Sequence, residues 1–210
     1  MPLDEPLPPV AILCGGRGTR LQHGTESIPK PQVEIGGRPI VWHVVQIYAV
    51  QGFRDFVLLT GYRGELIERF VAAEAWPAGV TVRCLDTGVD TPTGGRLHRA
   101  HGRAATMTVV RPELQFGVTH LDGDGRVTGF EEKPRSEQWI NGGFFCFEPA
   151  GLDYVAADSV LEREPLERLA ADGGLRAYRH GGFWECMDTY KDAVQLNDLW
   201  DEGKAPWRSW

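Results

Sequence analysis

An alternation of strand-like and helix-like segments in the first part of the chain restricts the fold more than any other feature of the sequence. Short apolar runs end at turn residues, and segments with apolar residues at helical spacing separate them. The predicted order is strand, helix, strand, helix, strand, over residues 9–16, 39–52, 53–61, 64–76 and 80–88. This order is typical of a parallel sheet with crossover helices, in which ligands bind beyond the carboxyl ends of the strands.

Mixed strands and helices make up the rest of the chain. Residues 105–112, 116–122 and 126–134 are predicted strands, and a tight Gly-Asp-Gly turn joins the last two. A strand, a helix, a strand-like segment and a final helix are expected at residues 141–149, 161–174, 175–189 and 190–203. The sequence contains no linker, repeat or low-complexity segment, so residues 1–210 are expected to form one domain.

The composition excludes several classes of function. The net charge of −7 argues against general nucleic-acid binding, although a local basic site can still bind an anionic substrate. No apolar run approaches the roughly 20 residues that a membrane span needs, and the acidic, proline-containing start is not typical of a signal peptide. The four widely spaced cysteines are expected to be buried free thiols. A cytoplasmic enzyme or binding protein is the remaining prediction.

The glycine cluster after the first predicted strand, in the sequence "ILCGGRGTRL", has two explanations. It can be a plain turn, or a loop whose backbone N–H groups hold a phosphate. The P-loop needs a Gly-Lys-Ser/Thr sequence and the dinucleotide fingerprint needs glycine where Leu21 stands, so neither fits. Lys30 follows between two prolines that restrict its backbone. It is a candidate for neutralising phosphate charge, and a solvated surface lysine is the alternative.

Together, "GGRGTRL" and "PKPQVEIGGRPI" resemble the signature of the sugar-nucleotide pyrophosphorylases. The resemblance continues through "GYRGELIERF", "DTGVDTPTGGRL", "EEKP", "INGGFF" and "FWECMDT", and so covers nearly the whole chain. Three segments, "VEIGGRPIVWH", "TGGRL" and "GKAPW", are most similar to the glucose-1-phosphate cytidylyltransferase family. The resemblance implies an α/β architecture, namely a Rossmann-like nucleotidyltransferase fold with a mixed, mostly parallel sheet and flanking helices.

The family reaction that this resemblance implies is nucleotidyl transfer. An oxygen of a sugar 1-phosphate attacks the α-phosphorus of CTP and pyrophosphate leaves, while Mg²⁺ offsets phosphate charge. Positioning and charge neutralisation dominate such chemistry. The resemblance implies that Arg20 and Lys30 are the catalytic cations, because they match an arginine of the triphosphate loop and a lysine that steadies the phosphates. The resemblance implies that the triphosphate is held by Gly15, Gly16, Gly18 and Thr19. It implies that the base is read by Thr93, Gly94, Gly95 and Arg96.

The resemblance also implies residues for the sugar phosphate and the metal. Glu132, Lys133, Asn141 and Gly142 match residues that contact the sugar phosphate. Asp188 matches one of two aspartates that hold Mg²⁺. Most of these residues have a structural alternative. Glu132 and Lys133 can be a charge pair at a hairpin end. Asn141 can be a turn residue, and Asp188 can cap the helix that follows it.

One family motif has no match in the chain. The family carries a strand that ends in Tyr-Gly-Asp-Gly, whose aspartate is the other magnesium ligand, and a helix follows it. That strand and helix are missing near Arg99 and Ala100, so the fold is expected to be shorter by about one strand and one helix. Asp122 and Asp124 do not replace the motif, because they lie in the predicted hairpin turn. The missing strand is central in the family sheet. The sheet must therefore close up, borrow a strand from another subunit or stay incomplete.

Three functions follow as hypotheses. The first is synthesis of CDP-glucose from CTP and α-D-glucose 1-phosphate. The second is a non-catalytic homologue that binds a nucleotide or sugar phosphate, or that pairs with a full-length enzyme. The missing aspartate favours this second hypothesis, and the other matching residues argue against it. The third is thymidylyl or guanylyl transfer. The tail at residues 198–210, with three tryptophans, is expected to pack on the body or on another subunit of a homo-oligomer.

Overall fold

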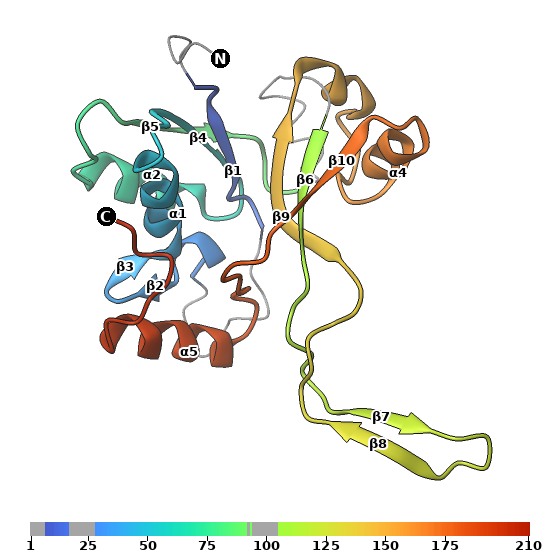
Figure 1. Ribbon diagram of the computed structural model, residues 1–210. Helices are drawn as coiled ribbons and strands as arrows, with labels where there is room; N and C mark the ends of the chain where they lie inside the picture. Colours follow the sequence, from blue (N-terminus) through green and yellow to red (C-terminus); the bar gives the residue numbers. More distant parts are fainter. Residues whose placement is uncertain (1–6, 17–27, 92, 94–104) are drawn as a thin grey trace.

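The computed structural model of the protein describes residues 7–16, 28–91, 93 and 105–210. It contains two three-stranded sheets that lie side by side (Figure 1). The first sheet is parallel throughout, in the order β1-β4-β5. Its strands and the two helices between them are β1 (Val10–Leu13), β4 (Asp55–Thr60), β5 (Thr81–Asp86), α1 (Ile40–Ala49) and α2 (Gly64–Ala73). Each of these five elements lies within a segment for which the sequence predicts it.

The second sheet is mixed, in the order β10-β6-β9. β6 pairs in parallel with β10 and antiparallel with β9. The elements of this half are β6 (Ala105–Val110), β9 (Ile140–Phe147), the 3₁₀ helix η3 (Pro149–Tyr154), α4 (Glu164–Ala171) and β10 (Leu175–Arg179). The predictions are confirmed, with two corrections. The strand-like segment 175–189 is a strand only as far as Arg179 and then runs irregularly to α5 (Tyr190–Asp201). The helix η3 was not predicted.

Three short elements near Lys30 have no counterpart in the sequence predictions. They are the 3₁₀ helix η2 (Lys30–Gln32) and the two strands of a hairpin, β2 (Glu34–Ile35) and β3 (Arg38–Pro39). Gly36 and Gly37 form the hairpin turn with φ values of 57° and 70°, a left-handed conformation that glycine adopts without strain. Strands of two residues are too short to show an alternating pattern, so periodicity does not reveal them.

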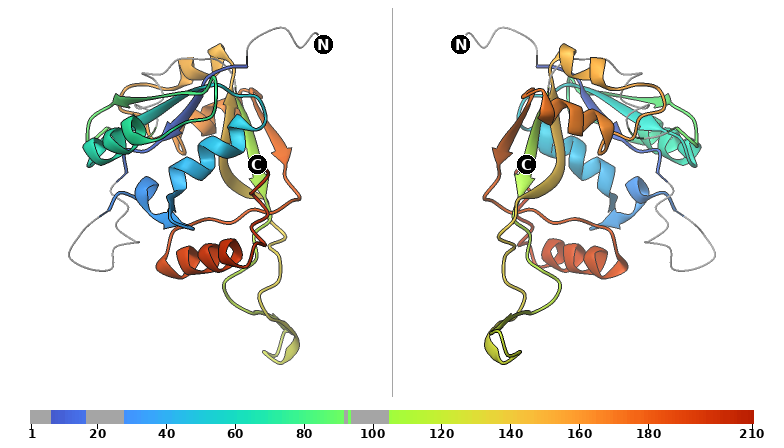
Figure 2. Two further views of the ribbon diagram at one scale, coloured as in Figure 1. Left: turned by 90° about the vertical axis from the view of Figure 1, so that its left-hand side faces the viewer. Right: turned by 90° about the vertical axis from the view of Figure 1, so that its right-hand side faces the viewer.

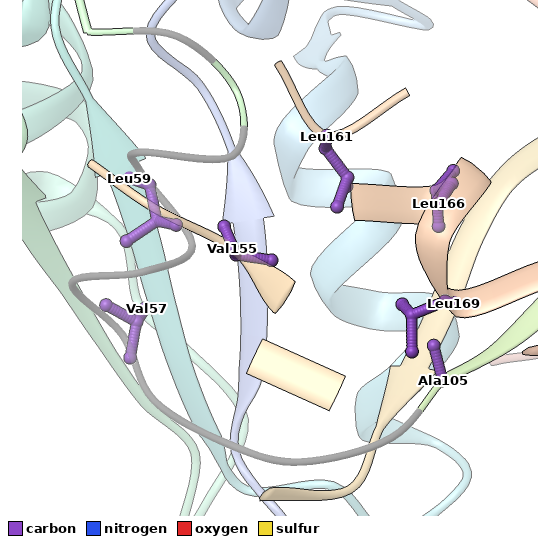
Figure 3. Packing of buried hydrophobic residues seen from close by; sticks show 7 residues of the cluster. All are labelled: Val57, Leu59, Ala105, Val155, Leu161, Leu166 and Leu169. Carbon is purple, nitrogen blue, oxygen red and sulfur yellow. The ribbon is translucent and has the colours of Figure 1, made fainter. Parts of the chain in front are cut away.

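Side-chain packing joins the two sheets. Among the described strands, β1 pairs with β4 alone and β9 pairs with β6 alone, so no backbone ladder crosses the boundary. Buried residues of both halves meet in one cluster instead (Figure 3). Its members are Val57, Leu59, Ala105, Val155, Leu161, Leu166 and Leu169. In the described part of the chain the sheet does not close up, and its two halves share a hydrophobic core instead. A strand borrowed from another subunit stays a prediction.

Helix α5 and the C-terminal tail pack on the N-terminal half of the same chain. The Asn197 side chain accepts the Gly36 N–H at 2.9 Å and donates to the Glu34 carbonyl at 3.2 Å. The Trp200 ring lies so close to Gly36 that a Cβ there would fall 2.0 Å from the indole nitrogen. The hairpin turn therefore requires glycine at position 36 for its contact with α5 as well as for its backbone conformation.

Tryptophans of the tail surround His43 of α1. The rings of Trp200, Trp207 and Trp210 lie 4.9, 6.4 and 6.2 Å from the His43 ring, between centroids. The His43 side chain is 3% exposed, and its Nε2 lies 2.8 Å from the Ile35 carbonyl oxygen. This aromatic cluster fixes the end of the chain against α1.

Acid is expected to destabilise the fold through His43. Burial lowers the pKa of His43 below 6.5, outweighing hydrogen bonds to the backbone of Ile35 and Arg38. Because the folded-state pKa lies below the unfolded one, the stability is complete above about pH 6.5 and is lost as the pH falls from there toward the folded pKa. Urea unfolding of the wild type and of His43→Gln between about pH 5 and about pH 8 measures this. The wild type should lose stability more steeply with acid, and parallel pH profiles would contradict the prediction.

The strands β7 (Val118–Leu121) and β8 (Val127–Glu131) form a hairpin that projects from the body of the molecule (Figures 1 and 2). The Asp122 carboxylate accepts the N–H groups of Asp124 and Arg126 at 3.1 and 2.9 Å and so closes the turn. The predicted tight turn is confirmed, and Asp122 has the role that the sequence analysis gives it.

The predicted burial of the cysteines is confirmed only in part. All four cysteines are free thiols, but burial was predicted too broadly, since Cys14 is buried, Cys84 and Cys186 are half-buried, and Cys146 is exposed. Burial raises the pKa of the Cys84 thiol to about 11. In the described part of the chain, no helix has both the length and the apolar character needed to cross a lipid bilayer.

Candidate active site

The glycine loop begins at the carboxyl end of β1, where the sequence predicts it. The Cys14 N–H donates to the Leu59 carbonyl at 3.0 Å, and the Tyr62 N–H donates to the Gly15 carbonyl at 3.3 Å. These bonds hold the buried Gly15 beside the turn after β4, and Gly16 is exposed. The predictions for the rest of both nucleotide-binding segments fall on residues outside the described ranges, namely Gly18, Thr19, Arg20, Gly94, Gly95 and Arg96.

Lys30 and Asp188 meet although 158 residues separate them in the sequence. The Nζ atom of Lys30 lies 2.6 Å from Oδ1 of Asp188. Pro29 and Pro31 restrict the backbone on either side of the lysine. The two side chains are 42% and 47% exposed, so solvent and a ligand can reach the pair. The structure thus brings together a predicted phosphate-binding cation and a predicted metal ligand.

The alternative role of Asp188 as a helix cap is wrong. Thr189 is the N-cap of α5: its hydroxyl oxygen accepts the Asp192 N–H at 3.2 Å, and Asp192 Oδ2 accepts the Thr189 N–H at 2.8 Å. This reciprocal arrangement is a capping box. Asp192 Oδ2 also accepts the Asp188 N–H at 2.9 Å. The cap therefore leaves the carboxylate of Asp188 available for Lys30.

The described residues do not build a site for a resident magnesium ion. Within the described ranges, no group of three or more His, Cys, Asp or Glu side chains could hold a metal ion. The Asp192 carboxylate is engaged by the backbone N–H groups of the capping box. The Lys30 ammonium next to Asp188 repels a cation. A magnesium ion that arrives on phosphate oxygens needs only one or two protein carboxylates. The assignment of Asp188 as a magnesium ligand stays a prediction.

A pocket of about 460 Å³ lies where β6 and β10 end and where β9 begins. Trp139 lines it, and the guanidinium carbons of Arg111 and Arg179 lie 5.9 and 5.6 Å from the centre of the Trp139 ring. The Nε of Arg111 donates to the Ser136 carbonyl at 2.6 Å, which holds the guanidinium group at the pocket. This pocket was not predicted, because no motif in the sequence marks Arg111 or Trp139.

The lining of the pocket suits an anion with polar groups. Arg111 and Arg135 contribute two cations, and Glu113 and Glu185 contribute two carboxyl groups. Burial, followed by the negative charges of Asp192 and Glu113, raises the pKa of Glu185 above its ordinary value. Glu185 therefore keeps its proton to a higher pH than an exposed glutamate. It lies in the segment "FWECMDT", where the resemblance offers a signal that could have found it.

Gly142 and Asn141, at the start of β9, lie next to this pocket. The Nε1 of Trp184, a pocket residue, donates to the Gly142 carbonyl at 3.0 Å. A Cβ at Gly142 would lie 3.1 Å from the Thr108 carbonyl oxygen, so glycine permits the close approach of β9 to β6. Asn141 Oδ1 accepts the Gly143 N–H at 2.8 Å, but Asn141 lies within β9 and pairs with Val109, so the turn-residue alternative is not confirmed. The assignment of both residues to the sugar phosphate stays a prediction.

Glu132 and Lys133 lie in the exposed segment between β8 and β9. In the described structure they make no ion pair with each other, so the alternative of a charge pair is wrong. Lys133 has a φ of 46°, a left-handed conformation that is uncommon for a residue with a side chain. Such backbone strain is found preferentially at functional positions. Their predicted contact with the sugar phosphate remains to be tested.

Thr93 connects the two halves of the molecule. Its hydroxyl donates to Glu162 Oε2 at 2.8 Å and accepts the Leu161 N–H at 3.1 Å. The hydroxyl thus links the segment after β5 to the turn before α4. The expected contact of Thr93 with a base stays a prediction.

Comparisons with known proteins identify the family. The family model described as a MobA-like NTP transferase domain matches residues 10–110, and the one described as a nucleotidyl transferase matches residues 95–201. The glucose-1-phosphate cytidylyltransferases of Salmonella typhi and Salmonella typhimurium are each 37% identical to this chain over 257 residues, covering 95% of this chain and 98% of each relative. The aligned length exceeds the 210 residues of the chain, so the relatives contain residues without a counterpart here.

A solved structure shows the same fold. The crystal structure of HddC from Yersinia pseudotuberculosis, complexed with GMP-PN, superposes with a TM-score of 0.68 at 20% sequence identity. The match covers 91% of this chain and 99% of that chain. The predicted nucleotidyltransferase fold is therefore confirmed, and the shared sequence places the protein more narrowly. The chain belongs to the nucleotidyl transferase family and, within it, to the glucose-1-phosphate cytidylyltransferases.

Proposed function

We propose that the protein transfers a cytidylyl group from CTP to α-D-glucose 1-phosphate and forms CDP-glucose and pyrophosphate. The substrates are those that the names of the 37% identical relatives imply. The observation that carries the proposal is the placement of Lys30. Prolines hold it beside an accessible carboxylate that a phosphate can replace. A lysine ammonium is a point charge that suits a phosphate group.

The proposed reaction needs charge neutralisation more than proton transfer. A phosphate oxygen of glucose 1-phosphate attacks the α-phosphorus of CTP, and the bond from that phosphorus to the bridging oxygen of the β-phosphate breaks. The attacking oxygen carries no proton at neutral pH, so no general base is required. Lys30 and Arg20 would stabilise the charge on the phosphates, and the backbone N–H groups of Gly15, Gly16 and Gly18 would hold the triphosphate.

In the proposed reaction, Mg²⁺ would be bound mainly by the nucleotide. When bound to the triphosphate, Mg²⁺ would neutralise charge on the phosphate oxygens. The described protein residues offer it Asp188 at most. Every other task falls on the chain itself, which binds and orients the two substrates.

The pocket between β6, β9 and β10 is the proposed place of the sugar. Trp139 and Trp184 give it apolar surface, and Arg111 and Glu185 give it hydrogen-bonding groups. A hexose ring carries both kinds of surface. The predicted sugar-phosphate residues lie along the chain segment that borders this pocket, at Glu132, Lys133, Asn141 and Gly142.

Pyrophosphate release tests the proposal directly. The purified protein is mixed with glucose 1-phosphate, Mg²⁺ and, in separate reactions, CTP, dTTP, GTP, UTP or ATP. Release from CTP is expected, and release from dTTP or GTP alone would instead support thymidylyl or guanylyl transfer. Among the described residues, no group of three or more His, Cys, Asp or Glu side chains could hold a metal ion, and this favours one rival, a non-catalytic homologue. That rival predicts calorimetric binding of CTP with no pyrophosphate release from any nucleotide.

We also propose that the protein is a homo-oligomer in which a second copy covers the hairpin β7–β8. Four large apolar side chains of this region are 57–80% exposed, namely Phe116, Leu121, Val127 and Phe130. A two-stranded hairpin is at best marginally stable alone in water, so a partner surface is needed.

Charge complementarity supports the edge strand β10 of the other copy as that surface. The hairpin carries exposed carboxylates at Asp124 and Glu131. β10 lies at the edge of its sheet and exposes Arg176, Arg179 and Tyr178. An extended segment can add to such an edge through main-chain hydrogen bonds.

Light scattering during size-exclusion chromatography is expected to give the wild type a mass of two or more chains. Leu121→Lys should lower it to that of one chain, because the lysine places a charge in the apolar contact. Val50→Lys changes an exposed apolar residue of the same class elsewhere and should leave the mass unchanged. A monomeric wild type would contradict the proposal.

The four free thiols fit a reducing compartment, and a cytoplasmic location is part of the proposal.

A further inference from the structure

We infer that Asp188 is a positioning residue for Lys30, and that it occupies the place at the lysine that a CTP phosphate takes when the nucleotide binds. This inference rests on the proposed function, because it requires CTP to bind beside Lys30. It differs from the assignment of Asp188 as a ligand of a resident magnesium ion. The two roles predict opposite effects of the same substitution.

The contact between Lys30 and Asp188 is of a kind that a phosphate can replace. The distance of 2.6 Å between Lys30 Nζ and Asp188 Oδ1 is that of a strong, charge-assisted hydrogen bond. A phosphate oxygen is an anionic acceptor of the same kind. Since both side chains are about half exposed, an arriving phosphate can displace the carboxylate without opening the core.

Both partners are held by their own elements. The prolines on either side of Lys30 limit where its side chain can start. The Asp188 N–H is tied to Asp192 Oδ2, within the capping box of α5. The helix therefore presents Asp188 at a fixed place, and the carboxylate keeps the long lysine side chain in one orientation before the nucleotide arrives.

The surroundings disfavour a metal at this carboxylate. The ammonium of Lys30 lies against it, and Asp192 is engaged by the backbone. The sequence adds no second carboxylate from residues 94–104, which contain no Asp or Glu, and only Glu26 from residues 17–27. A phosphate oxygen can contact the Lys30 ammonium only after it displaces the Asp188 carboxylate, and this displacement costs part of the binding free energy. Asp188 should accordingly weaken CTP binding while it orients Lys30.

Calorimetric titration of CTP into the wild type, Asp188→Asn, Lys30→Ala and the double variant tests this, in buffer with Mg²⁺ and in buffer with EDTA. Asp188→Asn should bind CTP about two- to fivefold tighter in both buffers, since an exposed ion pair of ordinary strength no longer competes. Lys30→Ala should bind CTP about tenfold weaker or worse. In the Lys30→Ala background, the gain from Asp188→Asn should shrink, because the carboxylate then has no lysine to occupy.

Two controls separate the effect from charge and from folding. Asp201→Asn makes the same change of charge at an exposed position at the other end of α5 and should leave CTP affinity unchanged. Thermal unfolding should show Asp188→Asn as stable as the wild type, because half-exposed ion pairs contribute little to stability.

Three results would overturn the inference. The first is weaker CTP binding by Asp188→Asn in Mg²⁺ with no change in EDTA, which is the signature of a metal ligand. The second is the same gain in affinity with or without Lys30, which would reduce Asp188 to a general repulsive charge. The third is the absence of CTP binding by the wild type and all variants, which would sink the proposed function as well. The first two results leave the proposed function intact.

Discussion

Replacement of Lys30 by alanine is expected to lower kcat/KM for pyrophosphate release from CTP and glucose 1-phosphate by about 10²- to 10³-fold, the usual effect of removing one group that stabilises transition-state charge. The loss should lie mainly in kcat, because charge builds on the leaving pyrophosphate as the reaction proceeds. Initial rates measured over a range of both substrates, with a coupled assay for pyrophosphate, give the two parameters separately.

Lys204→Ala is the matched control for Lys30→Ala. Lys204 forms a comparable ion pair, 2.8 Å from Glu202, at an exposed position of the tail. Its loss should leave the rate within about twofold of the wild type, since a surface pair of this kind contributes little. If the Lys30 variant keeps the wild-type rate as well, the lysine does not contact the reacting phosphates, and the proposed site is wrong.

Long elements of this fold could be predicted because each carries its own periodic pattern. The apolar run of β4 and the helical spacing of α1 and α2 are local patterns, which can be recognised without knowledge of the tertiary structure. The hairpin β2–β3 has two residues on each strand, so no pattern exists to be detected. Its Gly-Gly turn was visible in the sequence, but a turn alone does not show that strands flank it.

The pairing of Lys30 with Asp188 could not be predicted from the sequence, for a different reason. The resemblance indicated Lys30 and Asp188 separately. Only the fold shows that the Asp188 carboxylate, 158 residues away in the sequence, accepts a hydrogen bond from the Lys30 ammonium. The same holds for the pocket. Arg111 follows β6, Trp139 precedes β9 and Arg179 ends β10, and these residues meet because β6 lies between the other two strands. That strand order is a property of the tertiary structure, and no single segment of the sequence indicates it.

The absence of the family's central strand could be predicted from the sequence, but its effect on the sheet could not. The sequence allowed closure, strand borrowing or an incomplete sheet, since the choice depends on how the flanking residues pack. In the structure, Val57 and Leu59 of β4 belong to one buried cluster with Val155, which follows η3, and with Leu166 and Leu169 of α4 (Figure 3). One hydrophobic core thus takes over the connection that hydrogen bonds to a central strand would have provided.

Leu59→Ala should therefore destabilise the protein by about 3 to 5 kcal/mol, the upper part of the range for a leucine truncated in a core. Leu59 is fully buried, and it belongs to the cluster that joins the two sheets. Such a loss is a large share of the roughly 5–15 kcal/mol that holds a typical domain folded. Urea unfolding followed by circular dichroism and by tryptophan fluorescence measures it.

The control for Leu59→Ala is Leu7→Ala, the same truncation at a position before β1 that is 48% exposed. It should cost at most about 0.5 kcal/mol, as surface substitutions usually do. The comparison is made at a protein concentration where both variants have the same oligomeric state, because association also stabilises the fold. Equal losses in the two variants would mean that the shared cluster does not hold the halves together. A loss confined to Leu59→Ala, with the two spectroscopic transitions separating, would show that the halves depend on this core for their cooperativity, as a sheet without its central strand requires.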